Sequence, residues 1–146
     1  MTALPRVQLA LNVSNVDAAV RFYSKLFDTE PHKQRPGYAN FALDKPPLKL
    51  VLIENATAAG SLNHLGVEVD GVEQVAAARA AIDRVGLPSH DEDDVVCCHA
   101  RQDKVWVSDP DGRSWELYTI TDDNPVEPPV ASSAPTASSQ TPCCAS

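Results

Sequence analysis

Hydrophobic and polar residues follow one another in the same order twice along the chain. In the first half, residues 6–13 have the composition of a strand, and apolar residues at helical spacing over 16–27 predict an amphipathic helix. Residues 38–43 and 48–54 predict two short strands on either side of a proline-rich turn. This half therefore predicts a strand, a helix and then two or three short strands.

The second half repeats this order. Residues 62–69 predict a strand, and apolar residues from Val75 to Val85 mark a helix that ends before Gly86. Further strands are expected over 104–107 and 114–120, around an Asp-Pro-Asp-Gly turn. We therefore predict an α+β fold over residues 5–120, made of two tandem βαβββ modules at about 5–56 and 61–120. Modules this small bury little core alone, so they are expected to pair around a shared cleft.

Composition and charge narrow the class of partner. The formal net charge is −8, which argues against nucleic-acid binding because phosphate recognition needs clustered Lys and Arg. The chain has no apolar run of the roughly 20 residues that a membrane span needs, and it opens without the pattern of a secretory signal. We expect a soluble, cytoplasmic protein. Residues 121–146, rich in Pro and Ser, are predicted to form a disordered tail that ends in a cysteine pair, Cys143 and Cys144.

The four cysteines form two adjacent pairs. Cys97 and Cys98 follow one another, and their Cα atoms are therefore about 3.8 Å apart, too close for an ordinary disulfide between them. Neighbouring thiols suit a soft, thiophilic ligand, and the alternative is a pair of buried structural thiols. The acidic run at 91–94 predicts a solvated loop just before the pair, and hence exposed thiols.

Four polar residues occupy matching places in the two modules. Gln8 and His64 lie in the two opening strands, and Glu54 and Glu116 lie in the two closing strands. Polar side chains at such positions either face water or converge on a group that satisfies them. Their equivalence favours convergence in the shared cleft. The second module is longer between these positions, 52 residues against 46, and we place the excess in a loop over 88–99 beside the cleft.

The paired modules and the closing stretch 109–116 resemble the vicinal-oxygen-chelate superfamily, which includes glyoxalase I, extradiol dioxygenases and fosfomycin- and bleomycin-resistance proteins. This resemblance implies a metal in the cup between the modules, held by residues of the first and last strands. Carried onto this chain, the metal ligands are Gln8, His64 and Glu116. Glu54 is a candidate fourth ligand.

A closer resemblance is to the ArsI-type C–As lyases and related cadmium-induced proteins. It is carried by the stretches 6–11, 35–42, 46–54, 63–69, 97–98 and 102–107. The resemblance implies a non-haem Fe(II) enzyme that uses O₂ to remove the organic group from trivalent organoarsenicals, giving arsenite and, from the methyl compound, formaldehyde. It implies iron bound by Gln8, His64 and Glu116 and substrate held by Cys97 and Cys98.

The chemistry of these residues agrees with that resemblance. One imidazole, one carboxylate and one amide oxygen make a nitrogen–oxygen donor set similar to the facial triad of Fe(II) oxygenases, with positions left open. Two thiolates can replace the two exchangeable groups of a trivalent methylarsenical. Lys104 is a candidate for steadying an anionic intermediate, and the alternative is an exposed strand lysine.

Three other functions stay open from the sequence. A thiol-based protein that binds arsenic or cadmium without turnover would depend on both cysteine pairs and not on Gln8 or His64. A glyoxalase I-like lyase would use Glu54 as a fourth ligand around Ni²⁺ or Zn²⁺. A protein that only binds a drug is the third. Modules of the resembled superfamily pair within or between chains, so a homodimer with exchanged modules is an alternative to the site within each chain that we favour.

Overall fold

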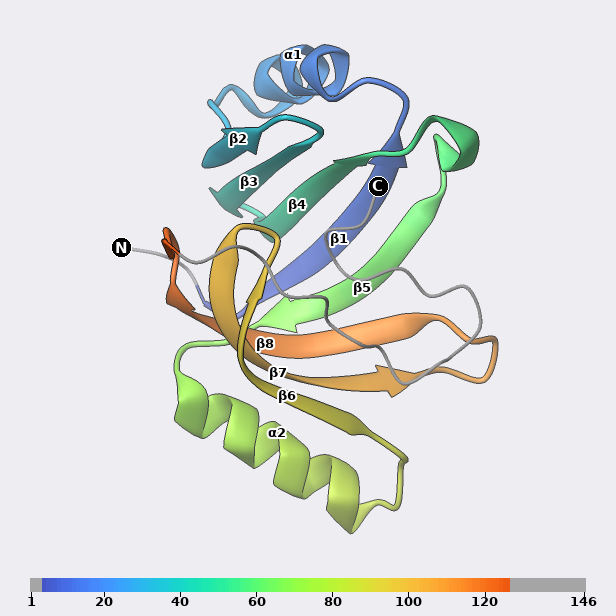
Figure 1. Ribbon diagram of the computed structural model, residues 1–146, viewed down its shortest axis with the longest axis vertical. Helices are drawn as coiled ribbons and strands as arrows, with labels where there is room; N and C mark the ends of the chain where they lie inside the picture. The colour runs from blue at the N-terminus through green and yellow to red at the C-terminus, as the bar shows by residue number, and fades with distance from the viewer. Residues whose placement is uncertain (1–3, 127–146) are drawn as a thin grey trace.

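The computed structural model describes residues 4–126, and most of the predicted tail lies outside the described residues. Both halves have the predicted order of strand, helix and three strands (Figure 1). The first half comprises β1 (Arg6–Val13), α1 (Val16–Phe27), β2 (Lys33–Arg35), β3 (Tyr38–Asp44) and β4 (Pro47–Glu54). After the short 3-10 helix η1 (Ala56–Ala58), the second half comprises β5 (Leu62–Glu68), α2 (Val72–Arg84), β6 (His90–Cys97), β7 (Ala100–Ser108) and β8 (Ser114–Asp122). The predicted α+β fold of two βαβββ modules is confirmed.

The eight strands of residues 4–126 belong to one curled sheet, in the order β2-β3-β4-β1-β5-β8-β7-β6. The two opening strands, β1 and β5, lie antiparallel at its centre, where Leu9 pairs with Leu65. Each opening strand also runs parallel to the closing strand of its own module, so that Leu9 pairs with Leu50 and Leu65 with Trp115. This register makes the two modules near two-fold equivalents about the Leu9–Leu65 pair.

The two helices lie outside the curled sheet at opposite ends of the molecule (Figure 1). α1 begins after its N-cap, Asn15, whose side chain accepts a hydrogen bond from the Ala18 amide at 2.8 Å. The apolar face of α1 covers a core formed by Val16, Ala39, Phe41, Leu43, Leu50 and Leu52. α2 packs on β7 and β8 in the second module.

Successive residues of a strand face opposite sides of the sheet. The strand residues that alternate with the core residues under the helices therefore line the concave face, away from the helices. Many of them are polar and nevertheless buried, among them Arg6, Gln8, Lys49, His64, Glu68, Lys104 and Glu116. Buried polar groups are costly unless they have partners. The concave face must therefore contain an internal polar network, which is described below.

The acidic run at 91–94 is part of strand β6, so its prediction as a solvated loop is wrong. Successive side chains of a strand face opposite sides, and only Glu92 of this run is buried. Glu92 accepts a hydrogen bond from Trp106 Nε1 at 2.8 Å, while Asp91 and Asp93 form ion pairs with Arg79 of α2. The extra length of the second module therefore lies largely in an eight-residue β6, compared with three residues in β2.

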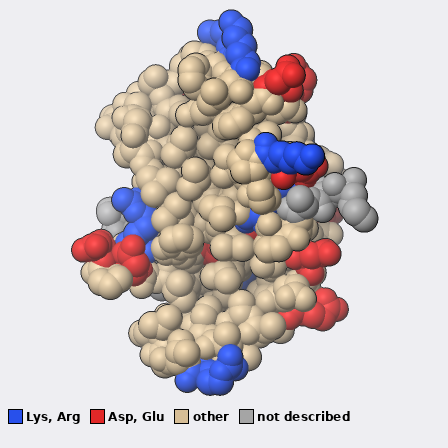
Figure 2. Space-filling view, turned by 180° about the vertical axis from the view of Figure 1, so that it is seen from behind, with Lys and Arg blue, Asp and Glu red and all other residues tan. Residues whose placement is uncertain are grey.

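Basic side chains are dispersed over one face of the molecule (Figure 2). On the face shown in Figure 2, basic residues stand apart from one another at the top, side and bottom of the molecule. Neither helix in the described chain combines the length and the apolar character needed to cross a membrane.

Candidate metal and thiol site

Three buried side chains from three strands meet on the concave face: Gln8 of β1, His64 of β5 and Glu116 of β8. Gln8 Nε2 lies 2.6 Å from Glu116 Oε2 and 3.3 Å from His64 Nε2. His64 Nε2 lies 2.9 Å from Glu116 Oε2. We call these three atoms the Gln8–His64–Glu116 triangle. Its corners come from both modules of one chain.

A glycine provides the space in which the triangle forms. Gly66 of β5 pairs with Gln8 on one side and with Glu116 on the other. A Cβ atom at this position would lie 2.7 Å from the Glu116 carbonyl oxygen and 3.0 Å from Gln8 Nε2. Because Gly66 has no side chain, the two flanking side chains can lean toward each other above it.

Two corners of the triangle are oriented by further side chains. The Tyr118 hydroxyl donates a hydrogen bond to Gln8 Oε1 at 2.7 Å. His64 Nδ1 lies 2.8 Å from Asn63 Oδ1, an acceptor that leaves His64 Nε2 directed into the triangle. Partners of this kind fix the orientation of metal-binding side chains in proteins.

The third corner is held by Lys104, whose side chain is fully buried. Its Nζ donates to Glu116 Oε1 at 2.7 Å and lies 5.4 Å from the Trp106 ring centroid. Burial alone would raise the pKa of Glu116, but the Lys104 ammonium and His64 outweigh burial and hold this pKa well below its ordinary value. Glu116 is therefore ionised at neutral pH. The alternative interpretation of Lys104 as an exposed strand lysine is wrong.

The donor set fits a divalent first-row metal. Adjacent donors in octahedral coordination, with bonds of about 2.1 Å, lie about 3.0 Å apart. The sides of the triangle are 2.6, 2.9 and 3.3 Å, so the spacing would be of this size with the Gln8 amide oxygen in the place that its Nε2 now occupies. Within residues 4–126, no three His, Cys, Asp or Glu side chains surround a common point. A three-donor site here therefore needs the Gln8 amide, which binds metals through its oxygen.

Glu54 does not reach the triangle. Its Oε2 accepts a hydrogen bond from the Val16 amide at 2.9 Å, at the N-terminus of α1 on the convex side of the sheet. The pairing of β1 with β4 and of β5 with β8 makes Val51, not Glu54, the counterpart of Glu116. The expectations that Glu54 matches Glu116 and is a fourth ligand are therefore wrong, since an apolar residue occupies that position.

Cys97 and Cys98 lie at the tip of the β6–β7 hairpin. Cys97 pairs with Ala100, so that Cys98 and His99 form a two-residue turn in which φ is positive at both residues, 53° and 64°. Such turns normally contain Asn and Gly, because side chains disfavour positive φ. Strained residues of this kind cluster at functional sites. The turn directs Cys98 into the cavity that the triangle lines.

The two cysteine sulfurs are close but not bonded to each other. Their Sγ atoms lie 3.7 Å apart, whereas a disulfide bond is about 2.05 Å long. Both are in disulfide bonds in this structure, so binding of a thiophilic ligand requires their reduction. Two sulfurs bound to one atom through bonds of about 2.3 Å lie roughly 3.8 Å apart, close to the observed spacing. Cys97 is buried, contrary to the expectation that both thiols are exposed.

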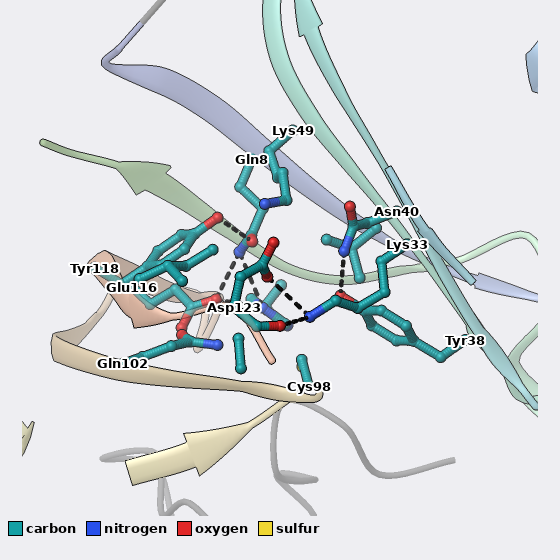
Figure 3. Close-up of a pocket in the computed structure, with 14 residues that line it drawn as sticks. Gln8, Lys33, Tyr38, Asn40, Lys49, Cys98, Gln102, Glu116, Tyr118 and Asp123 are labelled. Atoms are coloured by element: carbon teal, nitrogen blue, oxygen red, sulfur yellow. Dashed lines mark hydrogen bonds and ion pairs between the residues drawn. The ribbon is translucent and has the colours of Figure 1, made fainter. Parts of the chain in front are cut away.

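We call the two-residue turn of Cys98 and His99 the thiol turn. A small cavity separates it from the triangle (Figure 3). Its volume is about 20 Å³, which accommodates one group the size of a water molecule or a methyl group. Besides the triangle and Cys98, the cavity is lined by Lys33, Tyr38, Asn40, Lys49, Val51, Ala100, Gln102, Tyr118, Ile120 and Asp123.

Lys33 of β2 connects three segments at the edge of this cavity. Its Nζ donates to the His99 carbonyl at 2.7 Å and to Asp123 Oδ1 at 2.8 Å, and also contacts the Asp123 carbonyl. His32 Nε2 lies 2.6 Å from the other carboxylate oxygen of Asp123. Burial would raise the pKa of Asp123, but hydrogen bonds from Lys33 and His32 outweigh burial and lower it. Lys33 thus ties the first module to the thiol turn of the second.

Several cavity residues were not predicted from the sequence. Tyr118 follows Glu116 by two positions and therefore shares its face, so strand parity could have identified it. Tyr38 and Asn40 share the concave face of β3 in the same way. Lys33 carries no such signal, because it belongs to a three-residue strand and meets the thiol turn only in three dimensions.

The sequence of this chain is similar to those of several known proteins. Residues 6–117 match the family model described as Glyoxalase/Bleomycin resistance protein/Dioxygenase superfamily. The chain is 54% identical over 121 residues to the cadmium-induced protein CadI of Mycobacterium bovis, covering 83% of this chain and 80% of the relative. It is also 54% identical over 121 residues to the trivalent organoarsenical cleaving enzyme of Thermomonospora curvata, covering 82% and 80%. A protein of the same name from Bacillus sp. strain MD1 is 38% identical over 127 residues, covering 84% and 79%.

Solved structures share the fold at lower identity. A homoprotocatechuate 2,3-dioxygenase variant from Brevibacterium fuscum matches with a TM-score of 0.58 and 20% identity, over 82% of this chain and 33% of that one. The Mn(II)-bound glyoxalase from Novosphingobium aromaticivorans matches with a TM-score of 0.57 and 20% identity, over 86% and 43%. These similarities support the arrangement of paired modules around a concave face.

Proposed function

Since the chain belongs to the Glyoxalase/Bleomycin resistance protein/Dioxygenase superfamily, we propose that it is a non-haem Fe(II)-dependent dioxygenase that cleaves the C–As bond of trivalent organoarsenicals. Gln8, His64 and Glu116 are the proposed metal ligands. Cys97 and Cys98 are the proposed substrate-binding thiols. The names of the Thermomonospora and Bacillus relatives support this substrate class.

One observation carries the proposal: a three-donor triangle and a vicinal cysteine face the same small cavity. Val51, at the place of a fourth ligand, belongs to an apolar cluster against which Cys98 packs. Among residues 4–126, a metal bound to the triangle would therefore have no protein ligand on the side of the cysteines, where substrate and O₂ must approach. Metals that activate small molecules need such open positions.

The proposed reaction balances without an added reductant. When bound, Fe(II) would supply the activation of O₂. The thiolates of Cys97 and Cys98 replace two oxygen ligands of arsenic and so hold the substrate in one orientation. Overall, CH₃As(OH)₂ and O₂ give As(OH)₃ and formaldehyde. The methyl carbon loses four electrons, O₂ gains them, and arsenic stays trivalent.

The remaining residues of the site would position the metal ligands and exclude water, and would not themselves react. Lys104 keeps Glu116 ionised and fixes one of its oxygens. The 20 Å³ cavity admits a methyl group and little water beside it. The thiols must be reduced, and we therefore place the protein in a reducing compartment, the cytoplasm.

A second candidate function is supported by the CadI relative, whose name refers to cadmium. A protein that only sequesters a soft ion would need Cys97 and Cys98 but would be indifferent to His64. A glyoxalase I-like activity is disfavoured because Val51 occupies the position of the fourth ligand. The two candidates therefore differ in whether the triangle matters.

The test is aerobic incubation of reduced, Fe(II)-loaded protein with methylarsenite, followed by chromatography of the arsenic species and a formaldehyde assay. We expect arsenite and formaldehyde in equal amounts, both absent without O₂ or Fe(II). His64→Ala should abolish turnover but retain thiol-dependent arsenic binding, and Cys97→Ala should lose productive binding at low substrate. His90→Ala, which changes a histidine outside the cavity, is the control. Methylarsenite recovered intact after denaturation would reject turnover and favour sequestration.

A further inference from the structure

The Gln8 amide is oriented for a protein without metal. Its Nε2 points into the triangle, where it donates to Glu116 Oε2 at 2.6 Å, and its Oε1 points outward to the Tyr118 hydroxyl. This orientation follows from chemistry, because an ionised carboxylate only accepts hydrogen bonds. A metal at the triangle requires the reverse orientation, since the amide oxygen is the metal-binding atom. The amide must therefore turn by about 180° when metal binds.

Tyr118 is suited to both orientations. A phenolic hydroxyl donates one hydrogen bond and also accepts, so it can donate to Gln8 Oε1 or accept from Gln8 Nε2. Tyr118 and Gln8 are both buried, with exposed fractions of 2% and 4%. An outward amide without Tyr118 would therefore lose its protein hydrogen-bond partner in a buried place.

When Tyr118 accepts, its own proton needs a new acceptor. Burial raises the pKa of Tyr118 most, and the Glu68 carboxylate lies near enough to raise it further. Glu68 is the pairing partner of Tyr118 in the parallel β5–β8 register. In the described part of the chain, Glu68 Oε1 is buried and accepts no hydrogen bond, although Lys49 and Arg6 lie 3.5 and 3.8 Å away as ionic partners. A buried acceptor of this kind has room for one further donor.

We propose that Tyr118 is the positioning residue for the Gln8 ligand, and that metal binding turns the Gln8 amide and transfers the Tyr118 hydrogen bond from Gln8 Oε1 to Glu68 Oε1. Apart from the bonds between the metal and its ligands, only hydrogen bonds change in this step, and no proton leaves Tyr118. The inference rests on the metal site of the proposed function but not on organoarsenical cleavage, because it concerns metal affinity alone.

The first test measures Co(II) binding to reduced full-length protein under anaerobic conditions, by equilibrium dialysis and by the visible absorption of the bound ion. Tyr118→Phe removes only the hydroxyl and should raise the Kd about tenfold or more, the range found for lost partners of metal ligands. Tyr23→Phe, a change on the core-facing side of α1, should leave the Kd within twofold of wild type.

A double variant shows whether Tyr118 acts through Gln8. In the Gln8→Ala background, Tyr118→Phe should cause no further loss of Co(II) affinity. An equal loss in both backgrounds, or a Kd for Tyr118→Phe within twofold of wild type, would overturn the proposal. If substrate is never cleaved but this pattern holds, the proposed reaction fails while the amide reversal stands.

The second test uses the wild-type residue at position 118, so its result does not depend on how a Tyr118 variant folds. Nuclear Overhauser effects from the Gln8 side-chain amide protons, assigned by their loss in Gln8→Ala, report which way the amide points. They should reach the His64 ring in metal-free protein and the Tyr118 ring after Zn(II) is added. The same contacts in both states would reject the reversal.

Discussion

Val51 occupies, in the first module, the position that Glu116 occupies in the second. β4 runs parallel to β1 as β8 runs parallel to β5, and the register places both side chains one residue beyond equivalent pairs, Leu9–Leu50 and Leu65–Trp115. Both side chains line the same cavity. The near two-fold site therefore has four inward positions but only three donors, and Val51 is the reason that one side of the triangle is apolar.

Val51→Glu should convert the triangle into a four-donor site. We expect tighter binding of Ni(II) or Zn(II) and loss of C–As cleavage, because the added carboxylate would take the position that faces the thiol turn. Without metal, a buried and unpaired carboxylate should destabilise the variant. The measurement is thermal unfolding with EDTA and with saturating Zn(II), beside the turnover assay.

The control for this prediction is Val51→Leu, which keeps the position apolar. It should show the wild-type increase in Tm on adding Zn(II), whereas Val51→Glu should show a larger increase. If Val51→Glu binds Zn(II) no better than Val51→Leu, then Val51 does not occupy the place of a fourth ligand.

Lys104→Met should cost more stability in metal-free protein than in metal-bound protein. Removing the fully buried ammonium leaves Glu116 without its nearest positive charge, a type of change that costs roughly 3–5 kcal/mol. A divalent metal at the triangle would restore positive charge beside Glu116 and so reduce the loss. Urea unfolding with EDTA and with saturating Zn(II) measures the two costs. Equal costs would show that metal does not bind next to Glu116.

The repeated order of elements could be predicted because it depends on local periodicity and turn residues. Gly86, for example, follows the last turn of α2 in the left-handed conformation that favours glycine. Parity within a strand could also be predicted, and it puts Gln8 and His64 on the concave face. The predicted end of the last strand is two residues short, since β8 extends to Asp122 rather than to residue 120.

Register between strands could not be predicted, and the errors at the site follow from that. Matching Glu54 to Glu116 by residue type ignores the pairing of β1 with β4, which puts Val51 at the equivalent place. The prediction of a loop at 91–94 fails because charge density alone does not distinguish a loop from an edge strand with one buried residue, Glu92. The hydrogen bonds that residues such as Tyr118 and Lys104 make to the triangle from outside also could not be predicted, because these contacts depend on side-chain packing across strands.

Gly66→Ala should impair the triangle specifically. Its new Cβ would overlap the Glu116 backbone carbonyl and crowd Gln8 Nε2, so that β5 and β8 must separate or the side chains must turn away. We expect at least tenfold weaker Co(II) binding together with lower stability. Gly60→Ala is the control, because that glycine has positive φ but no atom near the added Cβ. The control should lose stability but bind Co(II) as wild type does, and equal Co(II) losses would contradict a local role for Gly66.

Asp123→Asn should destabilise the protein in a pH-dependent way. Lys33 and His32 lower the pKa of the Asp123 carboxyl in the folded state below its ordinary value of 3.8, despite partial burial. A lowered folded pKa stabilises the protein fully above the unfolded pKa, and this contribution disappears as the pH falls through the folded pKa. Because the Asp123 side chain is 34% exposed, solvent screening limits the effect to about 1 kcal/mol or less. Urea unfolding should therefore show a difference between wild type and Asp123→Asn at pH 5 that shrinks between pH 4 and pH 2. In a Lys33→Met background the difference at pH 5 should be less than half as large. A difference that stays constant down to pH 2 would show that the ion pair does not contribute.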